Sequence, residues 1–112
     1  MNRVALETTL LIHGVPRAAS LPLFRELETI VRAGGATPAL VGVVRGEPVV
    51  GMSEQQLADM LGAGSAEGGF PAKLNTSTLG VAMHRGRNGA TTVSATLELA
   101  AAAGVRVFAT GG

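Results

Sequence analysis

The sequence contains no cysteine, tryptophan or tyrosine, and its only aromatic rings besides histidine are those of Phe24, Phe70 and Phe108. Without cysteine, neither disulfide bonds nor thiolate metal sites can stabilise the chain. So few aromatic residues leave almost no material for the base-stacking platforms of single-strand nucleic-acid binders. Nine basic and eight acidic residues give a formal net charge of +1, without a dense run of either sign. The charge pattern therefore argues against nucleic acids and acidic membranes as partners.

Long apolar runs are also absent, and none approaches the length that spans a membrane. The first residues lead into a mixed apolar and polar pattern that does not resemble a signal peptide. We therefore expect a cytoplasmic location. What the chain does have is 46% hydrophobic and only 15% charged residues over 112 positions, which predicts one domain with an ordinary core.

Lysine is nearly absent as well. Lys73 is the only one, and every other basic residue apart from histidine is an arginine. It lies in an otherwise uncharged stretch, residues 70–78, among small hydroxyl side chains. A lone lysine of this kind is either a solvated loop charge or a partner for an anion or a carbonyl group.

Apolar patterning over the first half of the chain predicts alternating strands and helices. Residues 4–12 are rich in Val, Leu, Ile and Thr, which predicts a buried strand with Glu7 on its more polar face. Ser20 is expected to cap an amphipathic helix that ends at Gly34, so that strand and helix form half of a βαβ unit. Residues 39–51 contain two β-rich runs around a turn, which predicts a hairpin.

The second half begins with Ser53 and Gln56, whose spacing predicts a capping box for a short helix through Leu61. Residues 62–69 are almost all small or polar, and this composition predicts a mobile loop that leads to Lys73. The position of the Lys73 ammonium group therefore depends on the conformation of this loop.

Two more helices are expected over residues 78–85 and 91–103, the second ending at Gly104. A last strand follows over residues 105–108 and has no helix after it. The pattern predicts an α/β fold: a mixed, partly parallel sheet flanked by helices on both faces (α/β/α), and incomplete at the C-terminus.

Three polar groups are candidates for chemistry: Glu7, Lys73 and the segment 88–93. Unpaired backbone N–H groups at a helix start, together with the hydroxyls of Thr91 and Thr92, can hold a phosphate or another anion, although ordinary helix capping explains the same residues. Glu7 is either a structural hydrogen-bonding partner or a general acid.

The two histidines, His13 and His84, lie far apart in the sequence and are isolated from other carboxylates. They carry no metal-binding signature, and each is more typical of a turn histidine. No metal site is therefore predicted from the residues of this chain.

Five short motifs, in order along the chain, resemble the pseudouridine-5′-phosphate glycosidase family. They are ALETTLLIHG (5–14), GATPA (35–39), VGMS (50–53), NGATTV (88–93) and GVRVFATGG (104–112). Because several separate motifs occur in the same order, the resemblance is specific. It implies that residues 1–112 are the N-terminal part of a single domain. It also implies an enzyme that reversibly cleaves the C–C glycosidic bond of pseudouridine 5′-phosphate, giving uracil and ribose 5-phosphate.

By this resemblance, Glu7 matches the proton donor of the family, Lys73 matches a lysine that contacts the substrate, and Thr92 and Val93 match a further substrate contact. The family uses a divalent metal, typically Mn²⁺, and forms homotrimers. Its nucleophilic lysine forms a Schiff base with the opened ribose. That lysine and the metal ligand are expected beyond Gly112, so the isolated chain is expected to be a truncated, inactive part of the enzyme.

One departure from the family pattern follows Lys73, where members often carry an Arg- and Asp-rich run and this chain has residues 74–78, LNTST. Two alternatives to the glycosidase therefore stay open. In the first, the chain is a non-catalytic sugar-phosphate-binding or subunit-association module. In the second, the same chemistry acts on a related C-glycoside.

Overall fold

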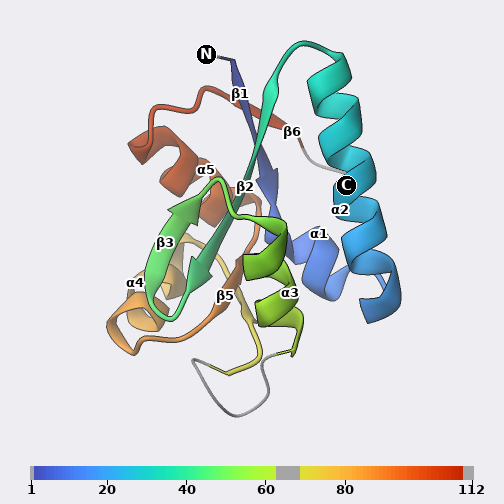
Figure 1. Cartoon of the computed structure of the whole chain (residues 1–112). Coiled ribbons are helices and arrows are strands. Elements are labelled where there is room, and N and C mark those ends of the chain that lie inside the picture. Colours follow the sequence, from blue (N-terminus) through green and yellow to red (C-terminus); the bar gives the residue numbers. More distant parts are fainter. Residues whose placement is uncertain (1, 63–68, 110–112) are drawn as a thin grey trace.

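A computed structural model describes residues 2–62 and 69–109, which form a mixed sheet with helices on both faces (Figure 1). The elements in chain order are β1 (Arg3–Glu7), α1 (Thr8–His13), α2 (Arg17–Ala33), β2 (Thr37–Val44), β3 (Glu47–Val50), α3 (Glu54–Gly62), β4 (Ala72–Leu74), α4 (Thr76–His84), β5 (Gly89–Thr91), α5 (Val93–Ala102) and β6 (Val107–Ala109). The predicted α/β/α class is confirmed. No helix in the described part is both long and apolar enough to cross a membrane.

The sheet is partly parallel, as predicted. Its strand order is β4-β5-β2-β1-β6, and β3 pairs with β2 as an antiparallel hairpin. β1 runs parallel to both β2 and β6, and β4 runs parallel to β5, whereas β5 runs antiparallel to β2. The parallel β1–β2 pair, with α1 and α2 between its strands, confirms the expected βαβ half-unit.

Alternation along β1 and β2 divides the core between the two faces of the sheet. Leu6 and Leu40 pack with the apolar sides of α1, α2 and α3, where Phe24 is almost completely buried. Ala5 and Val41 point to the other face and pack with α5. The helices in Figure 1 accordingly form two layers around the sheet.

The clearest departure from the sequence pattern concerns the strand expected over residues 4–12. β1 ends at Glu7, and α1 begins at the next residue. The hydroxyl of Thr9 donates to the carbonyl of Thr91 (2.9 Å), and the hydroxyl of Thr8 accepts from the N–H of Thr91 (2.7 Å). The prediction of a strand beyond Glu7 is therefore wrong, because long-range bonds to β5 outweigh the local β propensity.

The start of the second helix also differs from the prediction. Pro16 occupies the N-cap position of α2, so the helix begins at Arg17 and Ser20 lies inside it, fully buried. Proline is favoured at helix starts because its fixed φ suits the first turn and its missing N–H would be unpaired there. Ser20 is therefore not the cap.

Two of the three short strands in the second half, β4 and β5, are not predicted by the sequence pattern. Residues 72–74 form β4 where a loop is expected, and residues 89–91 form β5 where a helix start is expected. α5 consequently begins at Val93, and α4 begins earlier than predicted, at Thr76. Strands of three residues show no readable periodicity, and their pairing partners lie far away in the sequence.

Other predictions are confirmed. The N–H of Ser53 donates to the side chain of Gln56 (3.0 Å) and the N–H of Gln56 donates to the Ser53 hydroxyl (3.1 Å), which is the expected capping box. Gly104 has a φ of 78° and ends the segment after α5. Most of the loop expected over 62–69 lies outside the described residues.

A buried hydroxyl network joins β5 to three other elements. Thr91 is fully buried, and its hydroxyl donates to the carbonyl of Val41 in β2 (2.8 Å) and lies 2.7 Å from the hydroxyl of Thr96 in α5. Its N–H donates to Thr8 at the start of α1. Because every group of this network has a partner, it specifies the position of β5 relative to α1, β2 and α5.

Thr91→Val keeps the shape of the side chain but leaves the Val41 carbonyl and the Thr96 hydroxyl without this partner. We expect it to lower the free energy of unfolding by about 2 kcal/mol, since an unpaired buried polar group costs roughly 1–3 kcal/mol. Thr91→Ser keeps the hydroxyl and should cost only about 1 kcal/mol. The exposed Thr29→Val is the control. Urea unfolding followed by circular dichroism measures all three, and equal losses at Thr91 and Thr29 would contradict the network.

Gly89 and Gly80 form a second matched pair. A Cβ at Gly89 would overlap the Leu74 side chain of β4, whereas nothing lies close to a Cβ at Gly80 in α4. We expect Gly89→Ala to destabilise the fold by about 1–3 kcal/mol through overpacking. Gly80→Ala should stabilise it by about 0.5–1 kcal/mol, because alanine favours helix. Thermal melts of both variants test the β4–β5 packing, which the opposite order of stabilities would refute.

Candidate functional site

Three strands end at one place in the sheet. β1 ends at Glu7, which pairs with Val41 of β2, and Ala90 of β5 pairs with Gly42, the next residue of β2. Since β1 runs parallel to β2 and β5 runs antiparallel to it, the carboxyl ends of β1 and β5 approach each other. β4 is parallel to β5 and aligns Lys73 with Ala90, so it ends there too. The three carboxyl ends thus face one another at residues 41–42 of β2, and we name this meeting point the strand-end edge.

Lys73 is placed by its neighbours in the short strand β4. Leu74 is buried between α4 and α5 and anchors the strand, so alternation leaves Lys73 exposed on the opposite face. Among the described residues, the Lys73 ammonium group takes part in no ion pair. The side chain is therefore accessible to an anion, as the functional interpretation requires.

Thr92 and Val93 lie between the end of β5 and the first turn of α5. The N–H and the hydroxyl of Thr92 both donate to the carbonyl of Leu74 (2.9 and 3.0 Å), which fastens the end of β5 to the end of β4. Thr92 occupies the N-cap position of α5 without a capping bond from its side chain, and Val93 is 44% exposed. Both residues thus lie at the strand-end edge.

Thr91 does not fit the anion-binding hypothesis. Its side chain is fully buried, and its hydroxyl is committed to the Val41 carbonyl and to Thr96. The expectation that the Thr91 hydroxyl faces a ligand is therefore wrong. Its neighbour Thr92 is half-buried and closer to the surface, so any ligand contact in this segment starts there.

Glu7 is half-buried at the end of β1. It shares the face of Ala5 and Val41, which α5 covers, whereas Lys73 shares the face of Ala90, which packs with the helices of the other layer. The two side chains therefore leave opposite faces of the sheet near the place where these strand ends meet. The register of the described strands does not bring Glu7 and Lys73 together on one face.

Sequence reasoning missed the polar rim beside this edge. Asn75 and Thr78 form a capping box at the start of α4: the Asn75 side chain accepts from the N–H of Thr78 (3.1 Å), and the Thr78 hydroxyl accepts from the N–H of Asn75 (3.1 Å). The N–H of Thr76 donates to the Ser94 hydroxyl (3.2 Å), which joins α4 to α5. The Asn-x-x-Thr spacing is the sequence signal for this cap.

The described residues do not supply a manganese site. Within residues 2–62 and 69–109, no three His, Asp or Glu side chains gather closely enough to hold a metal ion. His13 instead contacts the carbonyl of Pro71. The residues present do not fit a bound divalent metal, and we derive no step through one.

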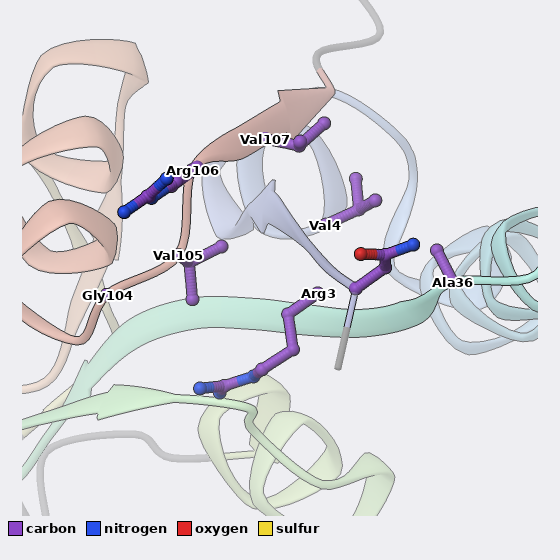
Figure 2. Close-up of a pocket in the computed structure, with 8 residues that line it drawn as sticks. Arg3, Val4, Ala36, Gly104, Val105, Arg106 and Val107 are labelled. Atoms are coloured by element: carbon purple, nitrogen blue, oxygen red, sulfur yellow. The ribbon is translucent and has the colours of Figure 1, made fainter.

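A separate hollow lies at the opposite end of β1 (Figure 2). It is lined by Arg3, Val4 and residues 104–107, which connect α5 to β6, and by none of the predicted site residues. The Arg3 guanidinium donates a hydrogen bond to the carbonyl of Val50 (3.0 Å) and so links β1 to β3. The hollow is therefore distinct from the edge at which β1, β4 and β5 end.

The sequence model of the family described as indigoidine synthase A-like protein matches residues 2–112. Among curated proteins, the pseudouridine-5′-phosphate glycosidase of Saccharopolyspora erythraea is 45% identical over 109 residues, which are 97% of this chain and 34% of the relative. That of Chloroflexus aurantiacus is 47% identical over the same shares of the two chains. The chain thus spans about a third of the length of the curated relatives that it matches.

Two solved structures match 99% of this chain. An indigoidine synthase A-like protein from Thermotoga maritima superposes with a TM-score of 0.89 at 38% identity, over 36% of its own chain. The prealnumycin C-glycosynthase AlnA, solved in complex with ribulose 5-phosphate, superposes with a TM-score of 0.75 at 35% identity, over 34% of its own chain. The motifs, the fold and the matches agree. The chain belongs to the indigoidine synthase A-like family and is similar in sequence to pseudouridine-5′-phosphate glycosidases.

Proposed function

We propose that this chain forms the proton-donating and sugar-phosphate-binding part of an enzyme that reversibly cleaves pseudouridine 5′-phosphate to uracil and ribose 5-phosphate. The observation that supports the proposal is the meeting of three strand ends, because the backbones of Glu7, Lys73, Thr92 and Val93 lie at or next to these ends. The substrate class in this proposal is inferred from the names of the relatives, which are pseudouridine-5′-phosphate glycosidases.

The chemistry of a C–C glycosidic bond explains the division of roles. The uracil carbon must be protonated as it leaves, and the sugar carbon must lose the electrons of that bond, so simple oxocarbenium chemistry does not suffice. A Schiff base between an enzyme lysine and the opened ribose would provide the electron sink. In this scheme Glu7 transfers a proton at the ring oxygen as the ribose opens.

Lys73 has the binding role in this scheme and not the nucleophilic one. An exposed ammonium group is a point charge suited to an anionic sugar phosphate. Its place in the sequence, fifteen residues before the NGATTV motif, corresponds to the binding lysine of the family. Because the chain has no second lysine, the Schiff base requires a group outside this chain. A manganese ion and a homotrimeric assembly stay predictions from the resemblance, and a cytoplasmic location stays a prediction from the sequence pattern.

A related C-glycoside is the second candidate substrate. The structural match to a C-glycosynthase in complex with ribulose 5-phosphate favours it, because that protein has a sugar phosphate bound and its name describes C-glycoside formation. Both candidates share a five-carbon sugar phosphate as the ligand. Product analysis of the complete enzyme separates them.

Binding of ribose 5-phosphate tests the assignment of Lys73. We expect the isolated chain to bind it, and Lys73→Met to weaken binding about tenfold or more, since a hydrogen bond to a charged group contributes roughly 1.5–3 kcal/mol. Arg106→Met, which removes a positive charge at the hollow of Figure 2, is the matched control and should bind as the unaltered chain does. Isothermal titration calorimetry that finds equal losses for both variants would reject the assignment.

The catalytic proposal predicts that the chain alone releases no uracil from pseudouridine 5′-phosphate. Adding the part of the Saccharopolyspora erythraea glycosidase that lies outside the match, as a separate polypeptide, should restore release. Glu7→Gln should then lower the rate at least about a hundredfold, the usual scale of a lost general acid. Glu47→Gln, at the exposed start of β3, is the control. Ribose 5-phosphate binding without uracil release, even after this addition, would favour a non-catalytic module instead.

A further inference from the structure

The three residues that precede β4, which we name the approach segment (residues 69–71), are fastened at both ends. The side-chain amide of Asn88 donates to the carbonyl of Gly69 (2.8 Å), and Asn88 is itself buried, with its side-chain oxygen accepting from the N–H of Arg45 (2.8 Å). At the other end, Nε2 of His13 lies 2.9 Å from the carbonyl of Pro71. A carbonyl can only accept, so Nε2 carries the proton and donates.

Phe70, in the middle of this segment, lies against the same corner of the molecule. Its ring meets the ring of His13 edge-on, with centroids 5.9 Å apart, and the guanidinium carbon of Arg17 lies 5.5 Å from the centre of the Phe70 ring. The approach segment is therefore attached to the end of α1 and the start of α2 by a hydrogen bond, a ring contact and a cation–π contact.

Lys73 depends on this attachment because it fixes the N-terminal side of a short strand, whereas Leu74 and Thr92 fix the C-terminal side. β4 has three residues and pairs with β5. Pro71 is fully buried and stands two residues before Lys73, so their Cα atoms are at most about 7 Å apart. A shift of the Pro71 carbonyl therefore reaches the backbone of Lys73 almost undiminished.

The described part of the structure shows no contact that orders the side chain of Lys73. It is exposed, and ordering a lysine side chain costs up to about 2 kcal/mol of conformational entropy. A backbone that is already fixed removes one part of the cost of ordering on binding. We propose that His13 is a positioning residue for Lys73 and acts through the Pro71 carbonyl, with Asn88 fixing the other end of the approach segment. This inference rests on the proposed function, since its effect is on sugar-phosphate binding.

The single lysine makes the test specific. Reductive methylation with ¹³C-formaldehyde labels the Lys73 ammonium group and the chain's α-amine, and it retains the positive charge of each. Titration with ribose 5-phosphate, followed by the ¹³C-methyl signal of Lys73, then reports binding at this one side chain. The Lys73→Met chain identifies the signal by its loss.

His13→Ala should weaken the affinity read at Lys73 about fivefold, which corresponds to one hydrogen bond of ordinary net strength. His13→Gln should restore most of it, because the glutamine amide can donate to the same carbonyl. His84→Ala, at the end of α4, removes the chain's other histidine and should leave the affinity unchanged. Backbone amide spectra and thermal melts of each variant establish that it is folded.

Two negative results have different meanings. If the ¹³C-methyl signal of Lys73 in the unaltered chain does not change when ribose 5-phosphate is added, the proposed function itself is overturned. A responding signal, with His13→Ala binding as tightly as the unaltered chain, would overturn only the positioning role. Equal weakening by His13→Ala and His84→Ala, or a His13→Gln chain as weak as His13→Ala, would also overturn it. If His13→Ala fails to fold, Arg17→Ala takes its place, since it removes the cation–π contact with Phe70, and unchanged affinity would count against the attachment.

Discussion

The point at which β1 stops is the constraint on which the rest of this structure depends. The hydroxyls of Thr8 and Thr9 bond to the backbone of Thr91, so the chain leaves the sheet directly after Glu7 and turns into α1. β5 then pairs with β2 from Gly42, one residue beyond the pairing of β1. If β1 continued to Ile12, as its composition suggests, the end of β5 would not lie beside Glu7, and no common edge would form.

The sequence predicts those parts of the fold that depend on interactions between residues close together in the chain. The hairpin, the Ser53 capping box and the βαβ direction follow from turn residues, cap spacing and apolar patterning, and all are present. The strands β4 and β5 could not be foreseen, because their pairing joins distant residues and each is only three residues long. For the same reason the Thr91 hydroxyl is a candidate anion contact in the sequence, although in the structure it belongs to the core.

The site is predictable in its residue types and less so in its geometry. Glu7, Lys73, Thr92 and Val93 were singled out by a family resemblance, and strand register brings their backbones to one edge. The alternation of faces, which only the register reveals, separates Glu7 from Lys73 across the sheet.

The most direct measurement of the central claim is a crystal structure of this chain with ribose 5-phosphate. The account predicts the sugar phosphate at the edge where β1, β4 and β5 end, with the Lys73 ammonium group within hydrogen-bonding distance of the phosphate or a sugar oxygen, and with Glu7 on its other side. Density for the ligand in the hollow between Arg3 and Arg106, with the strand-end edge empty, would contradict it.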